Sequence, residues 1–255
     1  EVVKSMRKDL TFIVDDWEYN PDDVTVRSIL GTDGREKIQM RLDLGVLQME
    51  PQGRPDGKRP YGHESLLEYY QEQLQLHSEL FGSDTDFVLN SDACALLRQE
   101  SMQYYYRYLS LFHLRRFDEV LRDAERNLNL YNFVHRYGNT EEDRAVLEQF
   151  RPYVLMMRAR ARACALLDEK KFNAAVREVD NGIEAIRKHW TQMHREDLLD
   201  NCREINFLND WRAKIEMTRP LTLEERLQHN LRRAVECEDY EKAAELRDQL
   251  KAIVV

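Results

Sequence analysis

Long apolar runs are missing from this sequence, and so are the common motifs of catalytic sites. No stretch approaches the roughly 18–20 apolar residues that a membrane-spanning helix needs, and the first ten residues lack the apolar core of a signal peptide. The chain contains no GxxxxGKS/T, GxGxxG, HExxH or GxSxG string, which are motifs of nucleotide-binding and hydrolytic enzymes. We therefore expect a soluble, cytoplasmic protein that is not an enzyme and does not contact the membrane.

Cysteine is scarce and widely spaced. None of the four cysteines belongs to a CxxC pair or has a histidine at ligand spacing, so neither a zinc site nor a redox dithiol is indicated. Among the seven histidines the closest pair is His189 and His194, whose i,i+5 spacing suits one helical face poorly. We expect free thiols, no metal, no catalytic residue and no cofactor.

Glycine and proline are also few, with 9 and 6 residues among 255, while charged residues make up 33%. Together with a high content of aliphatic residues, Glu, Lys and Arg, this composition favours a mainly α fold. The net charge of −9 argues against a protein whose main task is to wrap duplex nucleic acid, because such binding depends on clustered cations.

The first eighty residues hold most of the β-branched runs and predict a small α+β unit over residues 1–81. Apolar and polar residues alternate along one segment, the period of a strand with one buried face. Its apolar members are Ile38, Met40, Leu42 and Leu44. The turn signal Asp33-Gly34 joins this segment to the run 24–30, which predicts a β-hairpin. Residues 11–14 are a candidate third strand, and residues 64–81 have a helical period.

A loop rich in proline, glycine and cations follows the predicted sheet. Residues 51–62 carry three residues of each kind, which prevents regular structure and predicts that the cations face solvent. Arg54, Lys58 and Arg59 are candidates for binding a phosphate or an acidic surface. The simpler alternative is a connecting loop.

Beyond residue 92 the sequence predicts consecutive amphipathic helices that form a bundle over residues 92–218. Their approximate ranges are 92–114, 117–134, 141–169, 172–190 and 192–217. The run Tyr104–Tyr106, with Tyr108 and Phe112, covers more than one side of its helix and predicts burial between neighbouring helices.

Arginines are densest in the third of these helices. Arg158 and Arg162 share one helical face, and Arg151 and Arg160 lie close to them in sequence. A solvated face or intramolecular ion pairs are the expected arrangement. The alternative is contact with nucleic acid or an acidic partner through Arg151, Arg158 and Arg162.

An aromatic residue recurs after tight turns, at Phe117, Phe172 and Tyr240. A ring at such a turn packs between two antiparallel helices, and a small residue one turn later lets the backbones approach. Around Phe172 this pattern resembles tetratricopeptide repeats. The spacing of 55 residues (172 − 117) exceeds their period of about 34. We therefore predict a tetratricopeptide-like helical-hairpin bundle, not a regular solenoid.

The last segment, residues 222–255, predicts an antiparallel pair of helices. Thr222 and Glu225 fit a capping box that starts the first helix. Residues 236–239 form the turn, and Asp239 can cap the second helix. The apolar stripes of the two helices consist of Leu223, Leu227, Leu231, Ala234 and Val235, and of Ala243, Ala244, Leu246, Leu250 and Ile253.

Residues 231–250, LRRAVECEDYEKAAELRDQL, resemble the UVR motif shared by the excision-repair proteins UvrB and UvrC. The matching features are Ala234, the turn at 238–241, the Ala243-Ala244 pair and Arg247-Asp248. Related hairpins occur in Clp-type chaperone subunits and in activators of protein arginine kinases. The resemblance implies a bacterial protein whose hairpin docks another hairpin of its kind, in a partner or in a homodimer.

The residues expected to bind the partner fall into two groups. The apolar group consists of Leu231, Val235, Tyr240, Ala243, Leu246 and Leu250. The rim group, which sets partner choice through ion pairs worth at most ~1 kcal/mol each, consists of Arg232, Glu238, Arg247 and Asp248. The leading hypothesis is a non-catalytic adaptor. One alternative is a nucleic-acid-associated accessory factor of nucleotide excision repair, and another is a hairpin that packs only on its own bundle.

Overall fold

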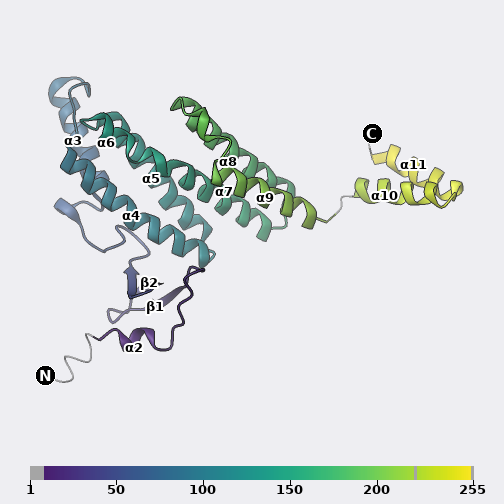
Figure 1. The fold of residues 1–255 in the computed structure, drawn as a ribbon, viewed down its shortest axis with the longest axis horizontal. Coiled ribbons are helices and arrows are strands. Elements are labelled where there is room, and N and C mark those ends of the chain that lie inside the picture. Colours follow the sequence, from purple (N-terminus) through teal and green to yellow (C-terminus); the bar gives the residue numbers. More distant parts are fainter. Residues whose placement is uncertain (1–8, 221–222, 254–255) are drawn as a thin grey trace. The chain divides into compact units, whose positions relative to one another are not determined.

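The computed structural model describes residues 9–220 and 223–253 (Figure 1). By the contacts among its residues the chain forms two compact units, Glu1–Asp210 and Trp211–Val255. The predicted mainly α fold with a small N-terminal sheet and a C-terminal helical hairpin is confirmed.

The two units differ from the predicted division at residues 82–91 and 222. The sheet and the long helices belong to one unit, because the loop after the sheet is bonded to the helices. Arg107, within the first long helix, donates to the carbonyl oxygens of Glu50 and Gly53 at 3.0 and 2.7 Å. The boundary of the second unit falls inside a helix, at residue 210.

The sheet contains three antiparallel strands in the order β1-β2-β3. Their bounds are Val26–Leu30, Glu36–Leu42 and Gly45–Met49. The predicted hairpin is β1 and β2, with Ser28 opposite Ile38. The predicted third strand is wrong: Thr11–Val14 forms the short helix α2, and the Asp9 carboxylate accepts a hydrogen bond from the backbone N–H of Thr11 at 2.9 Å. β3 takes that place in the sheet.

Burial along β2 does not follow the predicted alternation. Ile38 and Met40 are buried, but Leu44 beyond the strand is 93% exposed and Leu42 is 37% exposed. Lys37 and Gln39 are buried as well, because cross-strand partners satisfy their polar atoms: the Lys37 amine donates to Glu50 at 2.5 Å, and Gln39 donates to Gln48 at 2.9 Å. Polar side chains therefore close the second face of the sheet.

Helix α3, Leu66–Phe81, starts at an N-cap and ends at a left-handed glycine. The Ser65 hydroxyl accepts the N–H of Glu68, and Gly82 has φ +70°. Only the first turn is buried, through Leu66 and Leu67, whereas Phe81 at the end of the helix is 71% exposed.

The long helices pack as successive antiparallel neighbours, α4 on α5, α5 on α7 and α7 on α8 (Figure 1). Their bounds are Ser91–His113 for α4, Phe117–Tyr137 for α5, Arg151–Asp168 for α7, Phe172–Gln192 for α8 and Arg203–Thr218 for α9. In the aromatic run of α4, Tyr104 and Tyr108 are buried, while Tyr105, Tyr106 and Phe112 are half-buried.

Two of the predicted helices are shorter than expected. The range 141–169 is broken into α6, Glu141–Ala145, a 3₁₀ turn, Glu148–Phe150, and α7. Pro152 explains the break, since proline is tolerated only in the first turn of a helix. The range 192–217 begins as a helix only at Arg203.

The turns that end α4, α7 and α8 are built alike. Each has a non-glycine residue with positive φ, at Arg115, Lys170 and His194. The next residue donates its N–H to a carbonyl five positions back, as Lys171 does to Leu166 at 2.8 Å. This is the Schellman motif. The rings of Phe117 and Phe172 then begin α5 and α8. The specific likeness to tetratricopeptide repeats stays a prediction.

The second unit contains the hairpin of α10, Leu223–Glu236, and α11, Tyr240–Ile253. The predicted cap residue Thr222 lies outside the described residues, as do the side chains of Leu223 and Ile253. The Glu225 carboxylate accepts two hydrogen bonds from the Arg219 guanidinium.

Candidate functional site

A tight turn joins the two helices of the C-terminal hairpin. Glu238 has φ +57°, and Asp239 donates its N–H to the carbonyl of Ala234 at 2.8 Å, so α10 ends in the same Schellman motif as α4, α7 and α8. The Asp239 carboxylate then accepts the N–H of Lys242 at 3.1 Å and caps α11. This cap was predicted from the sequence.

The interior of the hairpin is a small apolar core. Leu227, Ala234, Ala243 and Leu246 are buried, and Leu231 and Leu250 pack against them partly buried. The residues predicted to contact a partner are therefore divided between two places. Leu231, Ala243, Leu246 and Leu250 belong to this core and hold the two helices together, because a two-helix unit of this size has few side chains with which to build one.

The remaining apolar residues of the predicted partner group lie on the outside, close to the turn. Val235 is 51% exposed and Tyr240 is 68% exposed. Cys237 between them is also exposed. The hairpin thus presents apolar surface around its turn that its own core does not use.

The four predicted rim residues are all exposed. Arg247 pairs with the neighbouring Asp248 at 3.0 Å, which leaves little charge for a partner at that position. Within the described residues, Arg232 and Glu238 form no ion pair. Their charges are therefore free to act on an approaching surface.

Comparison with known protein families identifies this segment. Residues 225–254 match the UvrB/uvrC motif. The matched range contains α11 and all but the first two residues of α10, so the predicted UVR resemblance is confirmed for this hairpin. The match covers the C-terminal hairpin only. No curated protein and no solved structure matches the chain.

The loop after the sheet differs from its prediction, because Arg54 does not face solvent. Its side chain is 12% exposed, and its Nε lies 3.0 Å from Oε2 of the fully buried Glu100 on α4. Glu100 also accepts the backbone N–H of Leu66 at 2.8 Å and pairs with Arg126. A buried carboxylate requires such partners, so Arg54 has a structural role.

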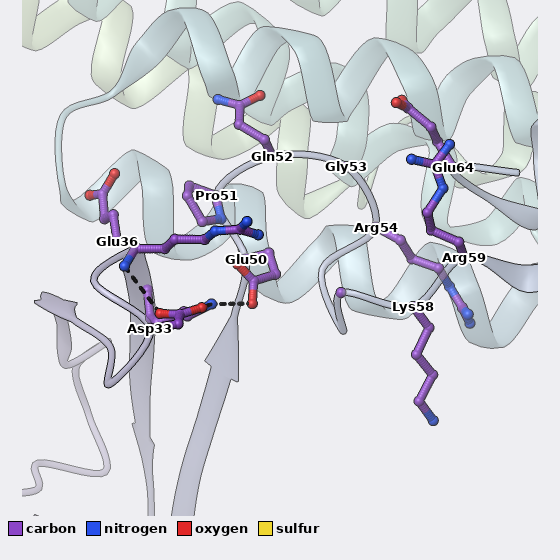
Figure 2. A pocket seen from close by; sticks show the side chains of 13 residues that line it. Asp33, Glu36, Glu50, Pro51, Gln52, Gly53, Arg54, Lys58, Arg59 and Glu64 are labelled. Atoms are coloured by element: carbon purple, nitrogen blue, oxygen red, sulfur yellow. Dashed lines mark hydrogen bonds and ion pairs between the residues drawn. The ribbon is translucent and has the colours of Figure 1, made fainter. Parts of the chain in front are cut away.

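Lys58 and Arg59 are exposed, and they line a cavity of about 460 Å³ between the loop and the sheet (Figure 2). The lining is of mixed charge, since Asp33, Glu36, Glu50 and Glu64 contribute to it. Lys37 bonds to both Asp33 and Glu50, whereas Figure 2 shows the Lys58 side chain extending away from them. This mixture gives little preference for an anion.

Two of the four arginines of α7 pair with acids of the same chain. Arg151 binds both oxygens of Glu148, at 2.5 and 2.7 Å. Arg162 pairs with Glu125 of α5 at 3.0 Å and with Glu178 of α8 at 3.7 Å. Arg158 is half-buried, and its burial, with the nearby Arg162 charge, lowers its pKa. Intramolecular pairing was the expected arrangement for this cluster.

The cysteines and histidines offer no alternative site within the described ranges 9–220 and 223–253. There, no three side chains of His, Cys, Asp and Glu converge to hold a metal ion. No helix in the same ranges is long and apolar enough to cross a membrane. Burial raises the pKa of Cys94 to about 11, which makes its thiol unreactive.

Sequence reasoning missed Glu100, around which the loop, α3 and α5 meet. A signal was present: Glu100 stands among Leu97, Ser101 and Tyr104 on the buried side of α4. A carboxylate on a buried helical face requires a cation from elsewhere in the fold.

Proposed function

We propose that the protein is a non-catalytic adaptor that docks a partner protein through its UVR hairpin. The observation that carries this proposal is the pair of exposed apolar side chains at the hairpin turn, Val235 and Tyr240, on a segment that matches the UvrB/uvrC motif. Isolated exposed apolar residues are common on protein surfaces, but here both flank one turn of a small unit.

The size of the hairpin supports docking. Its core consists of four buried and two partly buried side chains, and a two-helix unit with so few contacts gains stability by packing against a second element. A partner that covers Val235 and Tyr240 supplies that contact. The partner class that fits is another UVR-type hairpin, in a different protein or in a second copy of this chain.

The alternative role, an accessory factor that binds nucleic acid, has less support. Phosphate binding requires several unpaired cations. Of the six candidate residues, Arg54, Arg151 and Arg162 are paired with acids of the chain. Arg158 is half-buried. Lys58 and Arg59 remain as exposed cations in a lining of mixed charge.

The experiment compares two matched double variants of the full chain. Val235→Asp with Tyr240→Asp places two charges on the apolar surface at the turn. Gln228→Asp with Gln249→Asp places two charges at exposed positions of the same two helices. Sedimentation velocity measures self-association, and affinity capture from the source lysate measures binding of other proteins.

We expect the control to keep the oligomeric state and partners of the intact protein and the turn variant to lose them. Circular dichroism checks that both variants keep their helices. Identical partners and an identical oligomeric state in all three proteins would exclude hairpin docking. Binding to labelled duplex DNA that weakens steeply with salt, and that the turn variant retains, would favour the nucleic-acid role instead.

A further inference from the structure

Arg160 of α7 is held between two aromatic rings from different helices. Its guanidinium carbon lies 4.4 Å from the ring centre of Phe112 on α4 and 4.7 Å from that of Phe207 on α9. Both distances are within the range of cation–π contacts. Arg160 therefore contacts aromatic rings of two other helices.

No carboxylate neutralises this cation within the described residues. The single hydrogen bond of the Arg160 side chain is from Nη1 to the thioether sulfur of Met157 at 3.4 Å, which is a weak acceptor. Burial lowers the pKa of Arg160. The guanidinium is thus partly removed from water without a counter-ion, an arrangement that is unfavourable by itself.

Four other arginines of this unit with little exposure are paired. Arg54 and Arg126 bind Glu100, Arg107 binds Asp123, and Arg151 binds Glu148. Within the part of the chain that the structure describes, Arg160 lacks the carboxylate that each of these four arginines has. A ligand with a carboxylate would supply the missing counter-ion of Arg160.

Aromatic surface extends from Arg160 along α4 and α7. Tyr105 and Phe112 are seven residues apart on α4, as are Tyr153 and Arg160 on α7, so each pair lies on one face of its helix. The rings of Tyr105 and Tyr153 are 5.8 Å apart. Phe207 is 42% exposed, and the other four residues are half-buried. We call these five residues the Arg160 face.

We propose that the Arg160 face binds a peptide segment of a partner protein in which an Asp or Glu side chain is flanked by apolar side chains. The carboxylate accepts hydrogen bonds from the free N–H groups of Arg160, as charge-assisted pairs of this kind do. The flanking apolar side chains pack on the exposed edges of the rings.

The chemistry of the face favours a peptide over a nucleic acid. A phosphate backbone presents a charge at every nucleotide and is bound by several cations. The Arg160 face contains a single cation. A peptide with one carboxylate between apolar side chains is complementary to the Arg160 face, which has one guanidinium between aromatic rings. This site is separate from the UVR hairpin, and its test does not depend on hairpin docking.

The experiment selects ligands from a random dodecapeptide library displayed on phage, with the full chain as target. Selected peptides are synthesised and titrated against the intact protein, Arg160→Gln and Arg158→Gln by fluorescence anisotropy. Arg158 is a matched control because it is on the same helix, and the acids whose charges act on it are Glu125 and Glu178. Phe207→Ser tests one wall of the site with the guanidinium intact, and it remains informative if Arg160→Gln fails to fold.

We expect the selected peptides to be enriched in Asp or Glu between apolar residues. Loss of one charged hydrogen-bonded pair should weaken binding about tenfold or more in Arg160→Gln, and Phe207→Ser should also weaken it, while Arg158→Gln binds normally. The proposal is overturned by peptides without acidic enrichment, by equal binding to Arg160→Gln and the intact protein, or by a failure to select any peptide. Competition by a single-stranded oligonucleotide with a steep salt dependence would assign the face to nucleic acid instead.

Discussion

Arg107 joins the loop after the sheet to α4 and α5 through four hydrogen bonds. It binds both oxygens of Asp123 at 2.6 and 2.8 Å and donates to the carbonyls of Glu50 and Gly53. Both Arg107 and Asp123 are 1% exposed. Arg122 also donates to Asp123 at 3.0 Å. Removing one member of a buried charge pair is costly, because the remaining charge loses compensation in a medium of low dielectric constant.

The first prediction concerns this pair. Arg107→Met should lower the free energy of unfolding, measured by urea denaturation, by about 3 kcal/mol, since the buried Asp123 loses two of its three hydrogen bonds from arginine and keeps only that from Arg122. The double variant Arg107→Met, Asp123→Leu should recover much of the loss. As a control, Asp168→Asn breaks the exposed pair with Arg115 and should change stability by under about 1 kcal/mol. Equal effects at the two pairs would contradict the structural role of Arg107.

Asp143 shows how a single carboxylate can begin one helix and link it to another. Its Oδ2 accepts the hydroxyl of Ser91, the first residue of α4, at 2.8 Å and that of Thr140 at 2.9 Å, while its own N–H completes the capping box of α6. The hydrogen bond from Ser91, and then those from Thr140, lower the pKa of Asp143 from the usual 3.8. The ionised form is therefore favoured by folding.

A pH dependence follows from this shift. Because the pKa is lower in the folded state, Asp143 stabilises the fold above its ordinary pKa, and the contribution is lost as the pH falls through the lowered value. Asp143→Asn should therefore reduce the urea midpoint at about pH 7, and the difference from the intact protein should shrink towards about pH 2. Glu142→Gln, at an exposed neighbouring position, is the control. If the difference in urea midpoint grew on acidification, the pKa of Asp143 would be raised by folding and not lowered.

At the scale of elements, four turns between helices in this chain share one backbone conformation. Arg115, Lys170, His194 and Glu238 each occupy the left-handed region at the end of a helix, where glycine is the usual residue. In the sequence these turns are marked by the aromatic residues that follow them. In the structure they also share their backbone conformation. At three of the turns an aromatic ring follows two residues later, at Phe117, Phe172 and Tyr240.

The strain at these turns is testable by substitution. Lys170→Gly should raise the free energy of unfolding by about 0.5–1 kcal/mol, because relief of roughly 1–2 kcal/mol of left-handed strain outweighs the added entropy of the unfolded chain, about 0.4–1 kcal/mol. Glu169→Gly, at the preceding residue with φ −81°, should lower stability instead. Thermal unfolding measures both. If both substitutions lowered the free energy of unfolding, the Lys170 side chain would stabilise the fold by more than the left-handed strain costs.

The elements that could be predicted from sequence are those fixed by local periodicity. The predicted range 117–134 approximates α5, and 172–190 approximates α8, since a helical face repeats over five turns and errors at the ends average out. The break before α7 was predictable from Pro152, which the longer apolar pattern obscured. The break before α9 is less evident, because His194 is an unusual residue for a left-handed turn.

The parts that could not be predicted depend on residues distant in the chain. Arg54 is buried because Glu100, 46 residues away, requires a cation (100 − 54). In the hairpin, the apolar stripe predicted the core, but it could not separate residues that face the other helix, such as Leu246, from those left exposed, such as Tyr240. Periodicity identifies an apolar face, and only the partner element decides which part of that face is covered.

At the scale of the whole molecule, the two compact units differ in the size of their cores. Residues of the first unit such as Leu97, Leu111 and Val120 have no exposed surface, whereas the core residues of the hairpin each keep 6–8% of theirs. Local stability follows the number of buried apolar contacts. The hairpin should therefore open more readily than the long helices.

Hydrogen exchange measures this difference. In the protein alone, the amides of α10 and α11 should exchange at least about tenfold faster than those of α4 and α5. Binding of a partner at the hairpin turn should slow exchange in α10 and α11 without changing α4. Protection of the hairpin equal to that of α4 in the protein alone would show that it is already covered.

The four hydrogen bonds of Arg107 also set an order of events during synthesis. Neighbouring helices can pair soon after both have left the ribosome, since their contacts are local in sequence. The loop at Glu50 and Gly53 emerges early, but the arginine that holds it comes more than fifty residues later. Asp123, which neutralises that arginine, follows after another sixteen. Until the start of α5 has emerged, Arg107 lacks its counter-ion, and the loop after the sheet is held less firmly and is more accessible to chaperones.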